Sequence, residues 1–317
     1  MEEEKMNDTR KKHSEMEPSW NSPVIIESHI NGLRTKEYNP NIPEGYDEIA
    51  AEAIKCWEAG ACGIHVHNSS IHLTGEEAYE DYMKAMRPVM DKYPEVFWYP
   101  TNTANPSGEL SGIEHVEMLA KREGLRIGLV DSGSANLPLA ADFDKSHIMG
   151  LTYLVEFDTL NKQVDLCNKN NLGVVWGVYE PGYLRTALQY TKMGRSPKGS
   201  NIDFYFFGDY GSLAMQPINT TGIPPTVDSL HFYLDMMEGC ELPWFISIWG
   251  EGNLDTRPLI KRAIELGGHI KTGIELHYDP DSNPTNIDKL VEAQNIAKEV
   301  GRPLARQDEV YSILGLD

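Results

Sequence analysis

Short apolar runs alternate with amphipathic stretches along most of the chain. The apolar runs predict buried strands, and the stretches with apolar residues at helical spacing predict helices. The strands are expected at residues 24–30, 61–68, 96–101, 126–131, 173–180, 203–207, 244–249 and 269–276. The helices are expected at 44–59, 75–92, 111–123, 158–171, 182–193, 226–238, 254–266 and 286–300. One further segment, 151–157, has strand character and falls outside the alternation.

Eight apolar strands, nearly all followed by an amphipathic helix, predict a parallel sheet with both faces covered. Eight such units in 317 residues favour a closed (β/α)8 TIM barrel, an α/β fold, over a doubly wound sheet. No G-x-G-x-x-G motif follows the first strand, which counts against a dinucleotide-binding fold. We expect a single catalytic barrel over residues 22–317. Residues 1–21 are polar and aperiodic, and we expect a disordered extension there.

Composition narrows the classes of partner. The formal net charge of -20 argues against nucleic acid and anionic membrane, which both require basic surface. The four cysteines form no C-x-x-C pair, which favours free thiols in a reducing compartment. No apolar run approaches the roughly 20 residues that span a bilayer, and the polar N-terminus lacks a signal core. We therefore expect a cytoplasmic protein that acts on small molecules.

Two histidines end the expected strand 61–68. Residues at i and i+2 of a strand share a face, so His65 and His67 point the same way. In a closed barrel the last strand neighbours the first, so Glu275 can reach the space that both rings face. Two imidazoles and one carboxylate with open positions make a catalytic site for zinc or a similar divalent ion. Two hydrogen-bonded structural histidines are the competing interpretation.

Many other polar residues fall at the carboxyl ends of the expected strands, where barrel enzymes place their active sites. They are His29, Arg34, Thr101, Asn102, Ser134, Asn136, Glu180, Asp209, Glu251 and Lys271. A helix N-cap is the alternative role for a lone Ser or Thr, and a structural ion pair is the alternative for Glu180. So much polarity at the barrel mouth predicts an enzyme rather than an inert scaffold.

The chain resembles the β-keto acid cleavage enzymes from about Val24 to Leu316. The matching motifs are Gly63-Ile64-His65-Val66-His67, Val178-Tyr179-Glu180, Gly267-Gly268-His269-Ile270-Lys271-Thr272-Gly273-Ile274-Glu275, Gly301-Arg302-Pro303-Leu304-Ala305 and Ile313-Leu314-Gly315-Leu316. The resemblance implies a zinc-binding barrel, commonly a homotetramer, that converts a β-keto acid and acetyl-CoA to acetoacetate and a new acyl-CoA.

By this resemblance the zinc ligands are His65, His67 and Glu275, and the metal acts as a Lewis acid on the substrate. Thr101 and Ser134 are the hydroxyl residues that position substrate and thioester. We expect the remaining substrate contacts from Asn102, Asn136 and Asp209.

Three positions depart from the family pattern. Lys271 stands where the family usually has Arg, Leu276 where it has Asp, and Arg34 where it has an acidic residue. Leucine cannot move protons, so the base must come from elsewhere. The candidates are Glu180, Asp209, His29, His277 and Lys271. Arg34 together with Lys271 suggests a substrate with an additional anionic group.

Two further interpretations stay open. The first is a related metal-dependent barrel lyase, decarboxylase or hydrolase that has lost the thioester step, which the Leu276 change favours. The second is a metal-organised binding protein without catalysis. Ligation by two imidazoles and one carboxylate also does not separate zinc from manganese, cobalt or iron.

Overall fold

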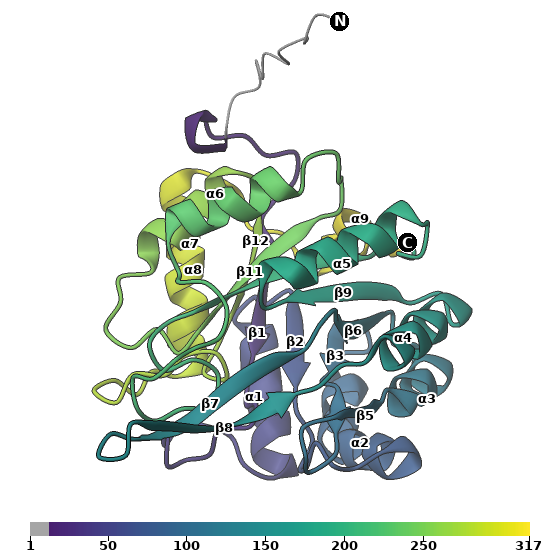
Figure 1. Ribbon diagram of the computed structural model, residues 1–317. Helices are drawn as coiled ribbons and strands as arrows, with labels where there is room; N and C mark the ends of the chain where they lie inside the picture. Colours follow the sequence, from purple (N-terminus) through teal and green to yellow (C-terminus); the bar gives the residue numbers. More distant parts are fainter. Residues whose placement is uncertain (1–12) are drawn as a thin grey trace, which may run out of the picture.

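The structure is a computed structural model that describes residues 13–317. Its main sheet has eight strands in the order β3-β2-β1-β12-β11-β10-β9-β6, and all neighbours run parallel. The strands are β1 Ile26–His29, β2 Gly63–Val66, β3 Trp98–Pro100, β6 Ile127–Asp131, β9 Gly173–Val178, β10 Asn201–Phe207, β11 Trp244–Trp249 and β12 His269–Thr272. The two ends of the order, β3 and β6, approach each other and nearly close the sheet (Figure 1). The predicted (β/α)8 barrel is confirmed.

Helices lie between the strands and cover the outside of the sheet (Figure 1). They are α1 Tyr46–Glu58, α2 Gly75–Lys92, α3 Glu114–Glu123, α4 Phe157–Lys169, α5 Pro181–Lys192, α6 Val227–Met236, α7 Arg257–Glu265 and α8 Asn286–Val300, followed by the short α9 Val310–Leu314. Each of the eight predicted helices is present. In the part of the chain that the structure describes, no helix is both long and apolar enough to cross a bilayer.

Two antiparallel hairpins interrupt the alternation, and the sequence pattern did not predict either as a pair. Strands β4 Thr103–Ala104 and β5 Leu110–Gly112 pair, so helix α3 begins at Glu114 rather than at residue 111. Strands β7 Ala135–Asp142 and β8 His147–Tyr153 form the second hairpin. The expected strand 151–157 overlaps only the end of β8, and α4 starts at Phe157.

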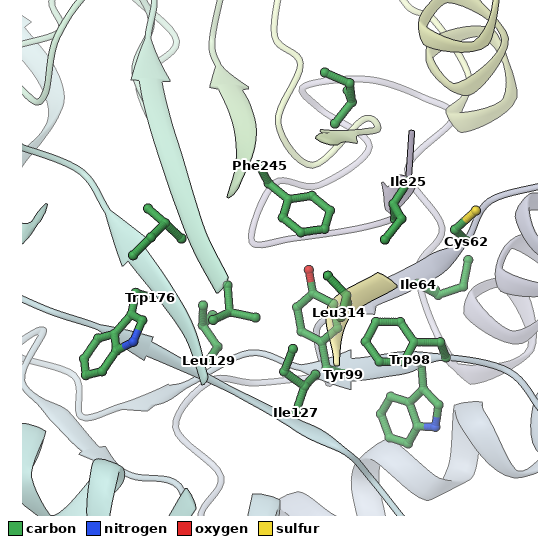
Figure 2. Close-up of a cluster of buried hydrophobic side chains, with 14 of the residues drawn as sticks. Ile25, Cys62, Ile64, Trp98, Tyr99, Ile127, Leu129, Trp176, Phe245 and Leu314 are labelled. Carbon is green, nitrogen blue, oxygen red and sulfur yellow. The ribbon is translucent and has the colours of Figure 1, made fainter. Parts of the chain in front are cut away.

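Apolar side chains pack on both faces of the barrel strands, and a few charged ones lie in the interior. Ile64, Trp98, Ile127 and Phe245 come from four different strands and are buried in one hydrophobic cluster (Figure 2). Alternate residues of each strand face inward, so His29 of β1, His65 of β2 and Tyr99 of β3 align as register partners. These three side chains are therefore positioned by the strands themselves.

The chain before β1 runs over the outside of the barrel. Residues 1–12 of the expected extension lie outside the described residues. The His13 ring lies 2.6 Å from an Asp235 carboxylate oxygen on α6, and Arg262 of α7 donates to the His13 and Met16 carbonyls. The Ser19 amide donates to the Glu265 carbonyl at 2.8 Å. Residues 13–21 thus contact the barrel along α6 and α7.

Candidate metal centre and active site

His65 of β2 and His67, which follows the strand directly, face the barrel interior. His65 Nδ1 lies 3.2 Å from the Tyr99 carbonyl oxygen. Because a carbonyl only accepts, Nδ1 carries the proton and Nε2 presents its lone pair. His65 Nε2 points to Glu275 Oε1 at 3.8 Å, and His67 Nε2 lies 3.1 Å from the same oxygen. The predicted meeting of these three side chains is present, although the chain reaches Glu275 by a different path.

That path is a turn, because β12 ends at Thr272 rather than continuing to Leu276. Gly273 has φ +132, and a Cβ there would overlap the His29 carbonyl. The Glu275 amide instead donates to that carbonyl at 3.2 Å. The strand expected over residues 269–276 is therefore shorter than predicted, and Glu275 lies on a turn rather than on the same strand face as Lys271. The close approach of Gly273 to β1 turns Glu275 onto the histidines.

His29 of β1 is a third imidazole beside Glu275. Its Nε2 lies 3.2 Å from the Tyr99 hydroxyl, which itself donates to Glu27 Oε2 at 2.7 Å. Since the hydroxyl proton goes to Glu27, the hydroxyl oxygen accepts the His29 Nε2–H. His29 Nδ1 is left with a lone pair 3.6 Å from Glu275 Oε2.

This cluster fits a divalent cation. Two ligand atoms on one tetrahedral zinc ion lie about 3.3 Å apart, given bonds of about 2.0–2.2 Å. The distances from the Glu275 oxygens to the ring nitrogens of His67, His29 and His65 are 3.1, 3.6 and 3.8 Å. Ligand atoms of His29, His65 and Glu275 lie within 4.8 Å of one another. His29 Nδ1 and Glu275 Oε2 are buried without a hydrogen-bond partner. Lone pairs that face a buried carboxylate repel it unless a cation lies between them.

Burial and charge set the protonation states that metal ligation requires. Burial lowers the pKa of His65 well below its usual value, which keeps the ring neutral. Burial by itself would raise the pKa of Glu275, but its interactions with the neighbouring His67 and His65 rings hold that pKa well below the usual range. A neutral imidazole and an ionised carboxylate are the forms that bind zinc.

The cluster opens into a cavity of about 320 Å³. Of the predicted site residues, the cavity is lined by Arg34, His65, His67, Thr101, Asn102 and Glu275. Its other polar walls come from His29, His72, Asn105, Asp131, Tyr153, Tyr179, Tyr205, Ser212 and Trp249. Its aliphatic walls come from Leu33, Ile71, Leu110, Leu129, Leu137, Leu151 and Leu213. The cavity is therefore largely apolar apart from the end that carries Glu275 and the imidazoles.

Arg34 brings a buried positive charge to this cavity. Its guanidinium donates to the carbonyls of His277 and Gly211, both at 2.9 Å, and lies 5.0 Å from the centre of the Tyr278 ring. Burial lowers its pKa to about 10, so it stays protonated at neutral pH. Among the ion pairs of the described residues, none joins Arg34 to a carboxylate. Arg34 both ties loops together and leaves its charge available to an anion.

Lys271 does not line the cavity, contrary to its expected role at the substrate. Its Nζ lies 3.1 Å from Asp203 and 3.7 Å from Glu27, and its side chain is 1% exposed. Ser247 donates to both Asp203 oxygens, and Tyr99 donates to Glu27. The ammonium thus lies between two carboxylates inside the barrel. These carboxylates balance its positive charge, so it does not contact the substrate.

Four other predicted site residues lie off the cavity. Ser134 Oγ accepts from the Val155 amide at 2.8 Å and so ties β7 to the segment before α4. Asn136 accepts from Thr152 across the β7–β8 hairpin, and Asp209 is exposed. Glu180 occupies the N-cap position of α5 without a side-chain cap hydrogen bond, and its carboxylate accepts from the Gly222 amide at 3.5 Å. Ser134 and Asn136 do not line the cavity as expected, because residues 135–142 form one strand of the β7–β8 hairpin.

His277 is also occupied. Its Nδ1 lies 2.7 Å from Glu251 Oε1, which Lys289 approaches at 3.1 Å. Neither His277 nor Glu251 lines the cavity. Of the bases proposed from the sequence, only His29 does, and it belongs to the metal cluster.

Asp131 and Tyr153 are cavity residues that the sequence analysis missed. Asp131 ends an expected strand, which is the same signal that selected the other polar residues. Tyr153 ends β8, and no sequence signal marked it because the hairpin was not predicted. Both enter the cavity from the same side and share a hydrogen bond of 2.6 Å.

Gly32 makes room for Glu275, and this yields a testable expectation. Gly32 has φ +66, and a Cβ there would overlap the Glu275 side chain. We expect Gly32→Ala to displace the carboxylate and weaken zinc binding by about 10- to 100-fold, as other losses of ligand support do. Titration calorimetry with zinc measures this. Gly239→Ala is the matched control, because Gly239 has φ +80 and open space around it. Equal zinc affinity in both variants would contradict the role of Gly32.

Comparison with known proteins identifies the family of the chain. The family model of the β-keto acid cleavage enzymes matches residues 23–316. The 3-keto-5-aminohexanoate cleavage enzyme of Fusobacterium nucleatum is 26% identical over 298 residues, which are 92% of this chain and 98% of that protein. The 3-oxoadipate:acetyl-CoA acetyltransferase of Cupriavidus necator is 21% identical and covers 93% of this chain and 95% of its own length.

A solved structure shows the same fold. ObcA, in a ternary complex with a C4-CoA adduct and oxalate, matches 87% of this chain and 68% of its own with a TM-score of 0.60. At 13% identity this likeness concerns the fold alone. The family match over nearly the whole barrel is the decisive finding, and the chain belongs to the β-keto acid cleavage enzyme family.

Proposed function

We propose that this protein is a divalent-metal-dependent enzyme that converts a β-keto acid and acetyl-CoA to acetoacetate and a new acyl-CoA. The observation that carries the proposal is the buried group of His65, His67 and Glu275 at the end of the cavity. Family membership supports the reaction class, and the Cupriavidus necator relative is named for an acetyl-CoA reaction.

We propose zinc, the metal that the family resemblance implies, and it would be held by His65, His67 and Glu275 with His29 beside them. When bound, it supplies a Lewis acid for the keto and carboxylate oxygens of the substrate. Tyr99 orients two of the ligands, because its carbonyl accepts from His65 and its hydroxyl accepts from His29. The rings are thereby aimed before substrate arrives.

The cavity also indicates the kind of substrate. Arg34 supplies the charge that attracts an anionic keto acid, and its Nε is buried without a partner. The Trp249 Nε1–H is a second buried donor without a partner on the same cavity. Leu137, Leu151 and Leu213 form part of the apolar wall, which favours a substrate whose side chain is mainly hydrocarbon.

A keto acid panel tests this proposal. Zinc-loaded protein is mixed with acetyl-CoA and β-keto acids that have short alkyl, long alkyl, aromatic or carboxylate-bearing side chains. We expect acetoacetate and the matching acyl-CoA from an alkyl or aromatic member, measured by chromatography with mass detection. The same mixtures without acetyl-CoA are the control. Keto acid consumption in that control would support the lyase or decarboxylase interpretation instead, and no turnover despite bound metal would support a binding protein.

The expected homotetramer stays a prediction. Phe143, Ile148 and Met149 of the β7–β8 hairpin are exposed apolar residues, and Phe157 beside it is 69% exposed. Such a patch suits contact between copies of the chain, and light scattering would measure the mass in solution.

A further inference from the structure

We propose that Asp131 is the catalytic base of this cavity, taking a proton from the substrate carbon between the keto and carboxylate groups. This inference rests on the proposed function and names the residue that replaces the missing acid at Leu276. Asp131 ends β6, is 2% exposed and lines the same cavity as the metal cluster.

One oxygen of Asp131 is held and the other is free. Oδ2 accepts from the Tyr153 hydroxyl at 2.6 Å and from Asn102 Nδ2 at 3.0 Å. Oδ1 is buried and has no hydrogen-bond partner. A buried carboxylate oxygen without a partner is costly, and it is the atom of this group that can accept a proton from a bound ligand.

Gly177 of β9 provides the space for that free oxygen. Asp131 and Gly177 are register partners in neighbouring strands. A Cβ on Gly177 would overlap Asp131 Oδ1. Any larger residue there would push the carboxylate aside, so the two strands together shape the position of Oδ1.

No other carboxylate is available to the substrate. Among the described residues that line the cavity, only Asp131 and Glu275 carry a carboxyl group, and Glu275 lies among the imidazoles. Glu251 is paired with His277 and Lys289, and Glu27 and Asp203 enclose Lys271. Asp131 is thus the carboxylate that the cavity offers away from the cluster of Glu275 and the imidazoles.

The environment of Asp131 suits proton transfer. Burial raises its pKa, while the hydrogen bonds from Tyr153 and Asn102 lower it and keep the shift limited. A carboxylate that is somewhat more basic than usual takes a carbon-bound proton more readily, because general-base efficiency rises with the pKa of the base.

The proposed step balances without any other reactant. Asp131 Oδ1 takes a proton from the carbon, the C–H electron pair becomes the enolate of the keto acid, and Asp131 becomes neutral. The enolate carbon then bonds to the acetyl carbonyl of acetyl-CoA and expels the CoA thiolate. The thiolate bonds to the original keto carbon, whose bond to the enolate carbon breaks, which gives the new acyl-CoA and the acetoacetate enolate. The neutral carboxyl returns one proton to this carbon of the acetoacetate enolate. The overall reaction consumes no proton, so a single base that later acts as the acid is sufficient.

Isotope exchange into acetoacetate tests the step without knowledge of the substrate side chain. Acetoacetate is the product that every reaction of this type shares. Zinc-loaded wild-type protein is incubated with it in D2O without acetyl-CoA, and NMR follows loss of the C2 methylene protons. We expect exchange faster than in buffer. We expect Asp131→Asn to slow the protein-catalysed exchange at least about 100-fold, the usual contribution of a general base.

Controls separate chemistry from folding. Asn keeps the shape of Asp and can still accept from Tyr153, so zinc content and melting temperature should match the wild type. Gly177→Ala should also slow exchange, because it displaces Oδ1 while leaving the carboxyl in place. Gly182→Ala, with open space around it, and Asp91→Asn, on the exposed side of α2, should not.

Three results overturn the proposal. The first is an Asp131→Asn variant that exchanges the acetoacetate protons as fast as the wild type does. The second is a wild type that forms acetoacetate from the keto acid panel yet exchanges acetoacetate no faster than buffer. The third is a wild type that neither forms acetoacetate from the keto acid panel nor speeds up the exchange. The failure of the panel then shows that the proposed function is wrong as well.

Discussion

Glu275→Gln should bind zinc at least about 100-fold more weakly than the wild type and lose about a thousandfold or more in turnover. The change keeps the shape of the side chain and removes the one negative charge among His29, His65 and His67. Loss even of a residue that only supports a ligand costs about 10- to 100-fold, and a direct anionic ligand contributes more. A Lewis acid is worth several kcal/mol of barrier, which is about a thousandfold in rate.

Zinc affinity by calorimetry and bound metal by mass spectrometry measure the first effect. The panel reaction measures the second. Glu58→Gln is the matched control, because Glu58 is an exposed helix carboxylate paired with Lys92. A Glu275→Gln protein that keeps wild-type zinc would show that the carboxylate is not a ligand. The His29→Gln variant then decides between three and four protein ligands. If His29 is a fourth ligand, this variant also binds zinc more weakly than the wild type.

Lys271→Met should lower the free energy of unfolding by about 3–5 kcal/mol, the usual cost of leaving buried charges without their partner. The ammonium is enclosed by Asp203 at 3.1 Å and Glu27 at 3.7 Å, and removing it leaves two carboxylates facing each other in the barrel. Urea unfolding measures the loss. Lys261→Met, on the exposed side of α7, controls for the change of residue type.

A second substitution distinguishes this ion-pair role from catalysis. Adding Asp203→Asn to Lys271→Met removes one of the two repelling charges, so part of the lost stability should return. If Lys271→Met were fully stable and only turnover fell, Lys271 would act on the substrate and the enclosed ion group would have no structural role. The Tyr99 hydroxyl contacts both Glu27 of this ion group and His29. We therefore expect Lys271→Met to lower zinc affinity as well, by less than Glu275→Gln does.

The strongest sequence signals were those with a fixed local period. Alternating apolar strands and amphipathic helices predicted the barrel, because each pattern repeats with the geometry of its element. The i, i+2 spacing placed His65 and His67 on one face for the same reason. The strand order of a closed barrel was enough to predict that Glu275 lies near them, although the turn that carries Glu275 was not predicted. Arg34, Thr101 and Asn102 were found because strand ends meet at one side of the barrel.

Other positions depended on where the chain turns. The β7–β8 hairpin moved Ser134 and Asn136 off the cavity and brought Tyr153 onto it. Its strands carry a proline and lack regular alternation, so no periodic signal marked them. The turn at Gly273 could not be predicted from local sequence, because it depends on close contact with the His29 carbonyl, which comes from the opposite end of the chain.

The sequence by itself determined the barrel, its strand order and the pair of histidines, since these follow from local periodicity and from the few ways that such elements pack. Only the tertiary structure decided which charges meet: Glu275 with three imidazoles, Lys271 with two carboxylates, and Asp131 with Tyr153 above Gly177. The reason is that the pKa and availability of a side chain depend on partners from distant strands, and strand register and loop path select those partners.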